Sequence, residues 1–314
     1  MKFKKEYIIL FFIIIALVLY LVFKKQDQIQ YELPDIKEIP RSEILKIEIM
    51  GKDGPIVIKK SNTTWAIGPE EYPADKKKIE KILGFIEKPV LVTMVSDSKN
   101  YTRYGLDKES RIMVTAYSGD SVIRSLDIGY SVSGHDYTFI KLENDHRVYH
   151  ARGKMRNLLE ADVDGLRDKT VFSFDQDKIN NITIHKGDKI YKMALAVASP
   201  EQADEDTESK KVKTSWEDLQ GNDMDNMIPG QLFSTLANLL CEKYIYGYKK
   251  EDLEKPLFSI TLKGEKEYNL SIYAKKEEDE DYPAVSSENP YPFILSGWKA
   301  EKLMKIMDKN EKPE

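Results

Sequence analysis

Two hydrophobic periods follow each other in the first part of the chain. ILKIEI at residues 44–49 alternates apolar and polar positions, and a GKDG turn separates it from PIVIKK at residues 55–60, which predicts a β-hairpin. After Asp75, which has a side chain suited to a helix N-cap, the period becomes helical. The apolar residues at helical spacing are Ile79, Ile82, Leu83 and Ile86. We expect this helix to cover one face of a sheet.

Strand-like segments continue after this helix. They are RIMVTAY at 111–117, SVIRSLDIG at 121–129, YTFIKL at 137–142 and VYH at 148–150. A short helix is predicted around Lys154 to Leu159. Because short turns connect the strands, we expect antiparallel pairing, since parallel pairs need long crossover connections.

The same order of elements restarts at Ile179. INNITIHKGDKIYKM predicts a second hairpin, GQLFSTLANLLCEKY at residues 230–244 predicts a second helix, and LFSITLKGEKEYNLSIY at residues 257–273 predicts two further strands. Residues 136–159 align without gaps on residues 281–304, with 6 of 24 positions identical. The repeated order indicates an internal duplication.

The N-terminal segment differs from both copies. Tyr7 to Phe23 contains no charged residue and as a helix would be about 26 Å long, close to the thickness of a bilayer core. A cleaved signal peptide needs a small-residue cleavage site, whereas here bulky residues run directly into Lys24 and Lys25. We therefore expect an uncleaved, single-pass anchor in the cell membrane. The excess of lysine before it predicts a cytoplasmic N-terminus and an extracytoplasmic body, periplasmic if two membranes are present.

Together these patterns predict an α+β protein. An N-terminal transmembrane helix is expected to precede two tandem, duplicated, mostly antiparallel sheet-plus-helix domains. The expected boundaries are residues 1–25 for the cytoplasmic tail and anchor, 26–41 for a polar linker, 42–170 and 171–309 for the two repeats, and 310–314 for a tail.

Aromatic residues recur at matching places in the two copies. Tyr104 and Gly105 open YGLDKES, and Tyr246 and Gly247 open YGYKKED. Glycine can adopt a positive φ at such a turn, while tyrosine buries its ring and keeps its hydroxyl in water. The two tryptophans that precede the helices are expected to anchor the cores. The structural or candidate interaction residues are Trp65, Tyr104, Gly105, Tyr137, Trp216, Tyr246, Gly247, Tyr282 and Trp298.

Charge and cysteine content narrow the class of protein. The net charge is −5, and the cationic excess lies near the N-terminus, so the remaining body is acidic and nucleic acid is not an expected partner. The single cysteine, Cys241, lies in an apolar run and excludes an intrachain disulfide. Acidic runs at residues 201–208 and 277–281 lack the pattern of a calcium-binding loop and predict solvated loops.

No arrangement of residues indicates catalysis. His146 and His150 have the i, i+4 spacing of a helical metal pair, but the residues around them favour a hairpin. SGHDY at residues 133–137 holds Ser, His and Asp too close together in sequence for a converging triad. We predict a non-enzyme, with no catalytic, cofactor-binding or metal-binding residues.

The order of motifs resembles the domain-of-unknown-function 4340 family, over residues 42–170 and more faintly 178–305. The motifs are Ile-x-Ile at 47–49, Trp65, Pro-Ala-Asp at 73–75, YGL at 104–106, LDIG at 126–129, Gly134 with Tyr137, VYH at 148–150 and LRDK at 166–169. The resemblance implies an extracytoplasmic protein associated with gliding-type ABC transport systems. It implies no catalytic residues.

Three functional hypotheses follow. The first is a membrane-anchored, non-catalytic accessory or scaffold protein of an ABC transport complex, with integral membrane transporter subunits as partners. The second is an envelope binding module that captures glycan, peptide or lipid between the repeats. It requires convergence of the aromatics Tyr130, Tyr137, Tyr282, Tyr291 and Trp298. A tethered hydrolase is the third, and would need carboxylates or histidines that converge in a deep pocket.

Overall fold

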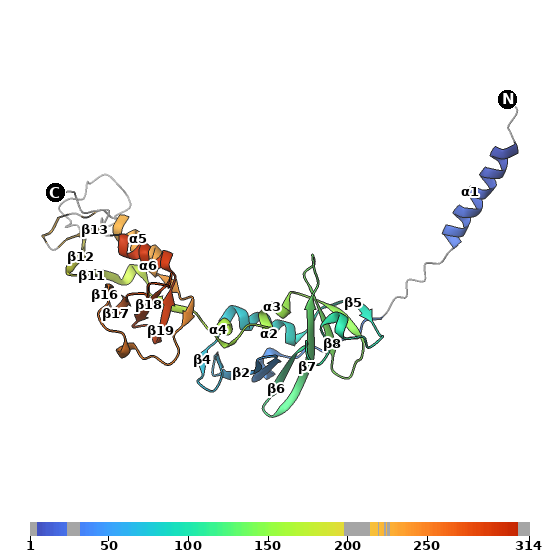
Figure 1. Cartoon of the computed structure of the whole chain (residues 1–314), viewed down its shortest axis with the longest axis horizontal. Coiled ribbons are helices and arrows are strands. Elements are labelled where there is room, and N and C mark those ends of the chain that lie inside the picture. The colour runs from blue at the N-terminus through green and yellow to red at the C-terminus, as the bar shows by residue number, and fades with distance from the viewer. Residues whose placement is uncertain are drawn as a thin grey trace, which may run out of the picture. The chain divides into compact units, whose positions relative to one another are not determined.

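The computed structural model describes residues 5–23, 32–197, 214–218, 220–222, 224 and 227–306 (Figure 1). The expected linker is therefore described from residue 32 onward, and the acidic run at 201–208 and the tail at 310–314 lie outside the described residues. The chain divides into two compact units. The first contains Met1–Pro69 and Lys77–Glu160, and the second contains Glu70–Lys76 and Ala161–Glu314.

An antiparallel sheet forms the body of the first unit. Its strands lie in the order β3-β2-β1-β6-β7-β8-β9-β5, and every pair is antiparallel. The strands are β1 (Lys46–Gly51), β2 (Gly54–Ser61), β3 (Thr64–Ile67), β5 (Leu91–Ser96), β6 (Ile112–Ser118), β7 (Ser121–Ser131), β8 (Tyr137–Leu142) and β9 (Val148–Arg152). Short 3-10 turns lie at Arg41–Glu43 and Thr102–Tyr104.

Helix α2 (Lys76–Glu87) lies along this sheet (Figure 1). Its apolar stripe is buried, as the helical period predicts, with Ile79, Ile82 and Ile86 each 1% exposed. Strand β1 presents Ile47 and Ile49 to the same core, in the alternation expected of a strand with one buried face. A second, five-residue helix, α3 (Met155–Leu159), follows β9.

The second unit contains another antiparallel sheet, in the order β13-β12-β11-β16-β17-β18-β19-β15. Its strands are β11 (Ile179–Lys186), β12 (Lys189–Val197), β13 (Thr214–Glu217), β15 (Lys243–Tyr244), β16 (Phe258–Gly264), β17 (Glu267–Ile272), β18 (Tyr282–Ser286) and β19 (Asn289–Leu295). The remaining elements of the unit are β4 (Tyr72–Pro73), α4 (Val163–Leu166), β10 (Thr170–Ser173), α5 (Met227–Leu236), β14 (Asn238–Leu240), α6 (Gly297–Lys305), and 3-10 turns at Gln176–Lys178 and Lys250–Asp252.

The two sheets have corresponding strand orders. Read from β3 to β5 and from β13 to β15, they match position by position. Along the chain, α2 comes after β3 and α5 comes after β13. Helix α3 follows β9, and helix α6 follows β19. The two units therefore share one topology, which is mostly antiparallel sheet with few helices.

The predicted N-terminal transmembrane helix is wrong, and with it the fold class as we stated it. A helix, α1 (Lys5–Phe23), lies at the expected place. However, among the described residues no helix is long and apolar enough to cross a membrane. The uncharged run of Tyr7 to Phe23 is shorter than the ~20 apolar residues that a spanning helix commonly needs.

The second predicted helix, at residues 230–244, is also wrong in its extent. Helix α5 ends at Leu236, and the leucines that follow form β14, which pairs with β10. Leu239 lies opposite Phe172 in this pair and is 1% exposed. Strand pairing with a distant segment thus outweighs the local helical spacing of the leucines.

The turn between β8 and β9 and the start of β9 contain a partly buried polar cluster. The hydroxyl of Tyr149, a residue that is 0% exposed, donates to Asp145 Oδ2 at 2.7 Å, and Arg147 Nη2 donates to the same oxygen at 2.8 Å. Burial alone would raise the pKa of Asp145. Hydrogen bonds from Arg147 and from the Tyr149 hydroxyl outweigh burial and hold this pKa well below its usual range.

We expect the free energy of unfolding to fall as the pH drops below about 5, because the unfolded chain protonates Asp145 near pH 4 whereas the folded chain resists protonation. A folded pKa below the unfolded one contributes stability that is complete at neutral pH and is lost on acidification. Asp145→Asn should therefore be less stable at pH 7 and lose less stability between about pH 5 and pH 3. Denaturant unfolding across this range measures both effects, and an unchanged acid slope in the variant would contradict the assignment.

Candidate functional site

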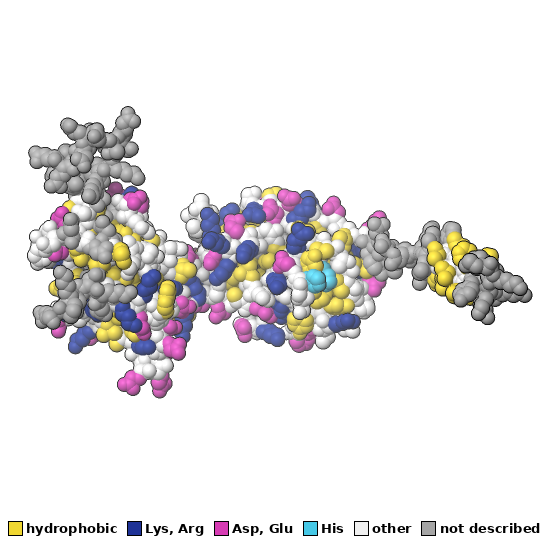
Figure 2. All heavy atoms as spheres, turned by 90° about the horizontal axis from the view of Figure 1, so that it is seen from above, with side chains coloured by type: hydrophobic (Ala, Val, Ile, Leu, Met, Phe, Trp, Pro, Cys, Tyr) yellow, Lys and Arg dark blue, Asp and Glu magenta, His cyan; other side chains and the backbone are white. Residues whose placement is uncertain are grey.

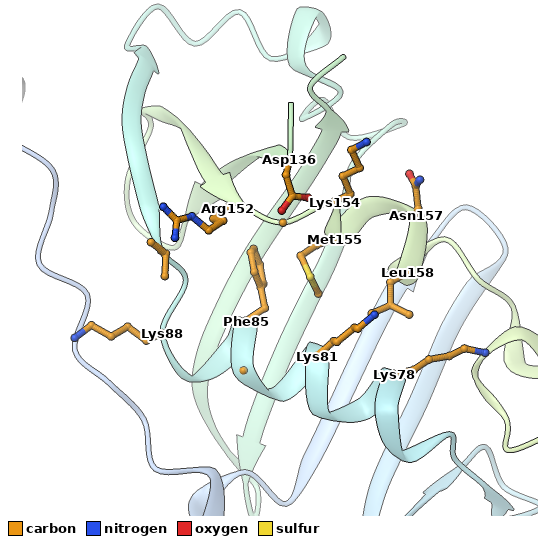
Figure 3. Close-up of a pocket in the computed structure, with 13 residues that line it drawn as sticks. Lys78, Lys81, Phe85, Lys88, Asp136, Arg152, Lys154, Met155, Asn157 and Leu158 are labelled. Atoms are coloured by element: carbon orange, nitrogen blue, oxygen red, sulfur yellow. The ribbon is translucent and has the colours of Figure 1, made fainter. Parts of the chain in front are cut away.

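A pocket of about 670 Å³ lies in the first unit, between α2 and the segment that joins β9 to α3 (Figure 3). A buried threonine fixes this segment. Thr138 Oγ1 donates to the Gly153 carbonyl at 2.6 Å and accepts from the Met155 amide at 3.0 Å. Thr138 is 0% exposed, so its two hydrogen bonds fix the start of α3 from the core side.

The floor of the pocket is apolar. Phe85 from α2 and Met155 from α3 point into it in Figure 3, and both are 8% exposed. Leu158 lines the same space, as does Val90, which precedes β5 and is 51% exposed. These side chains offer an apolar surface that a ligand can remove from water.

The rim of the pocket is basic. Five cationic side chains and one carboxylate, Asp136, line it. The cations are Lys78, Lys81 and Lys88 from or next to α2, and Arg152 and Lys154 from the other wall. Lys88 approaches Glu38 at 3.8 Å, while within the described part of the chain Lys81, Arg152 and Lys154 form no ion pair.

This concentration of positive charge is local. The chain as a whole has a net charge of −5, and basic and acidic side chains are interspersed over the face shown in Figure 2. Cationic side chains around an apolar floor attract an anion and disfavour a cation. Lysine and arginine side chains also reach over apolar surface with their methylene stems, so both parts can contact one ligand.

The candidate residues in the first unit lie outside this pocket. Trp65 is half-buried on β3. The Tyr104 ring lies 5.0 Å from the Phe139 ring, and Gly105 has a φ of +65°. Tyr137 stacks between His135 and His150, with both ring centroids 5.8 Å away.

The candidate residues in the second unit occupy varied environments. Trp216 belongs to the core and packs edge-on against Phe233 at 5.9 Å. Gly247 has a φ of +78°, and the adjacent Tyr246 is 55% exposed. Lys275 lies 5.1 Å above the Tyr282 ring, and Trp298, on α6, is 69% exposed.

Sequence reasoning missed a buried arginine in the second unit. Arg167 is 1% exposed, and its guanidinium carbon lies 3.7 Å from the ring centroids of both Tyr72 and Tyr244. The Tyr291 ring lies 5.0 Å away, and Arg167 Nη1 donates to the Tyr246 hydroxyl at 3.1 Å. Arg167 belongs to the LRDK motif at residues 166–169, for which we predicted no role. We call Arg167 and these four tyrosines the arginine cage.

The histidines do not form a metal-binding helix. His150 lies on β9, and burial, with a smaller effect of His135, lowers its pKa. Among the residues that the structure describes, no group of three or more His, Cys, Asp or Glu side chains is placed to hold a metal ion. The pocket between α2 and the β9–α3 segment is the candidate site because it combines a basic rim with an apolar floor.

The chain was compared with protein-family models, curated proteins and solved structures, and a family model matches it. No curated protein and no solved structure matches the chain. Residues 65–259 match the family described as Domain of unknown function (DUF4340), and this range covers more than half of the sequence and includes α2, β9, α3 and most of the arginine cage. The chain belongs to the Domain of unknown function (DUF4340) family.

Proposed function

We propose that this protein is a non-catalytic binding protein whose first unit holds a negatively charged ligand in the pocket between α2 and α3. The observation that carries this proposal is the ratio of five cations to one carboxylate around an apolar floor. Ligand pockets of about 300–1,000 Å³ commonly combine an apolar lining with a few charged groups that orient the ligand. The pocket has both properties.

Charge reversal at the rim tests the proposal. The protein should bind 8-anilinonaphthalene-1-sulfonate, an anion with an apolar ring system and an environment-sensitive fluorescence. Lys81→Glu combined with Arg152→Glu should weaken this binding at least about tenfold, because two attractive charges become repulsive. Both side chains are exposed, so the fold should be unaffected.

Lys77→Glu is the matched control, since Lys77 is an exposed lysine of α2 that does not line the pocket. It should leave the affinity for the dye within about twofold, as expected for a distant surface charge screened by salt. A fluorescence titration compares the three proteins. Equal loss of binding in the control and in the double variant would refute the pocket as the site.

A second candidate function is an accessory subunit of an ABC transport complex, as the family resemblance implies. The observation that favours it is Trp298, which is 69% exposed on α6. Tryptophan is enriched among the residues that contribute most to protein–protein binding. The expected location of the body outside the cytoplasm stays a prediction, and a reporter fused after Glu314 tests it.

Trp298→Ala should reduce recovery of a transporter subunit in copurification under mild detergent by about tenfold or more, without lowering thermal stability, because the side chain packs against little of its own unit. Ile190→Ala is the matched control, since Ile190 is also exposed, at 55%, and belongs to the same unit. Recovery of the protein alone, from cells that express its genomic neighbours, would count against this candidate.

A further inference from the structure

We infer that the ligand of the pocket is a free, single-chain amphiphile with an anionic head, such as an alkyl phosphate or a fatty acid. This inference rests on the proposed function and adds the class of ligand. It is carried by the spatial separation of two chemistries within one pocket, an apolar floor and a cationic rim (Figure 3).

The floor fits an alkyl chain. Phe85, Met155 and Leu158 converge there from two helices, and Val90 extends the apolar surface toward solvent. Among the lining residues no uncharged polar side chain other than Asn157 is present. A sugar or another polar ligand would lose its hydrogen bonds to water over such a floor without replacing them, whereas an alkyl chain has none to lose.

The rim fits a compact anion. Lys78 and Lys81 are one helical turn apart on α2 and so lie on the same side of the helix, while Arg152 and Lys154 come from the opposite wall. The cations are spread around the rim in Figure 3, so a phosphate or carboxylate head enters a positive field wherever it lies, and beside Arg152 it meets two parallel donors. Lys81, Arg152 and Lys154 form no ion pair within the described residues, so a head group does not have to break one, and Asp136 is the one lining carboxylate that it must avoid.

The size of the pocket favours a small molecule over a macromolecular partner. About 670 Å³ lies in the middle of the range for small-molecule sites. An amphipathic peptide helix would need a longer groove with apolar anchors repeated along it. Because the pocket has a single apolar floor, we expect it to hold one alkyl chain.

A chain-length series tests the inference. Octyl, decyl and dodecyl phosphate, each below its micelle-forming concentration, should displace the fluorescent dye with affinities that rise about fourfold per added methylene, because burial of each methylene contributes about 0.8 kcal/mol. Inorganic phosphate should compete at least about a hundredfold more weakly than dodecyl phosphate. Dodecyltrimethylammonium, with the same chain and the opposite charge, should not compete.

Val90→Asp should abolish the dependence on chain length, since it places a carboxylate in the apolar floor at a position exposed enough to leave the fold intact. Val122→Asp is its matched control, because Val122 is also 51% exposed in the same unit and does not line the pocket. It should leave the series unchanged.

The remaining outcomes separate this inference from the proposed function. Pocket-dependent binding of the dye without any effect of alkyl chain length would overturn the amphiphile and leave an anion-binding protein. Displacement by an acidic peptide but not by dodecyl phosphate, or binding only to phosphatidylglycerol vesicles, would also overturn it. No binding of dye or alkyl phosphate would overturn both.

Discussion

Replacing Arg167 by alanine should lower the free energy of unfolding of the second unit by about 3–5 kcal/mol. The guanidinium lies between the faces of Tyr72 and Tyr244, at 3.7 Å from each centroid. A desolvated cation over an aromatic face contributes about 2 kcal/mol, and removal of the side chain also leaves a cavity. Hydrogen exchange in peptides of the second unit, together with denaturant unfolding, measures the loss.

The polar contacts of Arg167 add to this expected loss. The Tyr246 hydroxyl accepts from Arg167 and donates to Asp164 Oδ1 at 3.2 Å, and Asp164 itself lies 3.8 Å from the guanidinium. Burial raises the pKa of both Tyr72 and Tyr244, so their rings stay neutral at physiological pH. Without the guanidinium, Asp164 keeps its hydrogen bond from the Tyr246 hydroxyl and its contact with Lys169 Nζ at 3.7 Å, but loses one of its two neighbouring cations.

Two further substitutions show which property of Arg167 matters. Arg167→Lys should remain destabilised by about 2 kcal/mol, because an ammonium group is a compact charge that cannot stack as a plane between two rings. Arg167→Met fills most of the space without charge. If the methionine variant is as stable as the natural protein, the cation contributes nothing and the role assigned to the arginine cage is wrong.

Many strands could be predicted from the sequence because the alternation of apolar and polar residues in a strand is visible within a few consecutive residues. YTFIKL at 137–142 forms β8 with the same bounds, and the alternation of ILKIEI places Ile47 and Ile49 in the core. The short helix expected around Lys154 is α3. Alternation and turn residues suffice where a strand pairs with the next strand along the chain.

Contacts between distant segments could not be predicted in the same way. The Asp168 amide donates to the Pro73 carbonyl at 2.8 Å, and the Asp75 amide donates to the Leu166 carbonyl at 2.9 Å. These bonds place Tyr72 beside Arg167 and assign Glu70–Lys76 to the second unit. No hydrophobic period in either segment indicates its partner, since each is too short to show one.

The candidate pocket depends on such contacts too. The lysines of α2 are evident in the sequence, where they indicate only a solvated helix face. Arg152 and Lys154 stand opposite them because the β9–α3 segment is held by Thr138. The pocket therefore lies within one unit, whereas the second of our functional hypotheses required a groove lined by aromatics between the repeats.

Two motifs of the family resemblance, YGL and LDIG, meet in the first unit. Gly129 of LDIG lies on β7, where a Cβ atom would come within 2.2 Å of the Tyr104 carbonyl oxygen and 3.0 Å of Leu106 Cγ. The turn at Tyr104 has little freedom to move away. Its amide and that of Leu106 both donate to the Tyr101 carbonyl, at 3.0 Å each, and Gly105 adopts a positive φ. Only glycine permits this approach of strand and turn.

Gly129→Ala should therefore lower the free energy of unfolding of the first unit by about 2–4 kcal/mol, because the added methyl group meets backbone rather than a mobile side chain. Gly51→Ala is the matched control, since Gly51 also lies on a strand of this unit, without positive φ, and has open space where its Cβ would be. Its effect should stay within about 0.5 kcal/mol. Denaturant unfolding and hydrogen exchange in β7 distinguish the two. Equal stabilities would mean that the Tyr104 turn yields without cost, and the contact would then not explain why YGL and LDIG occur together.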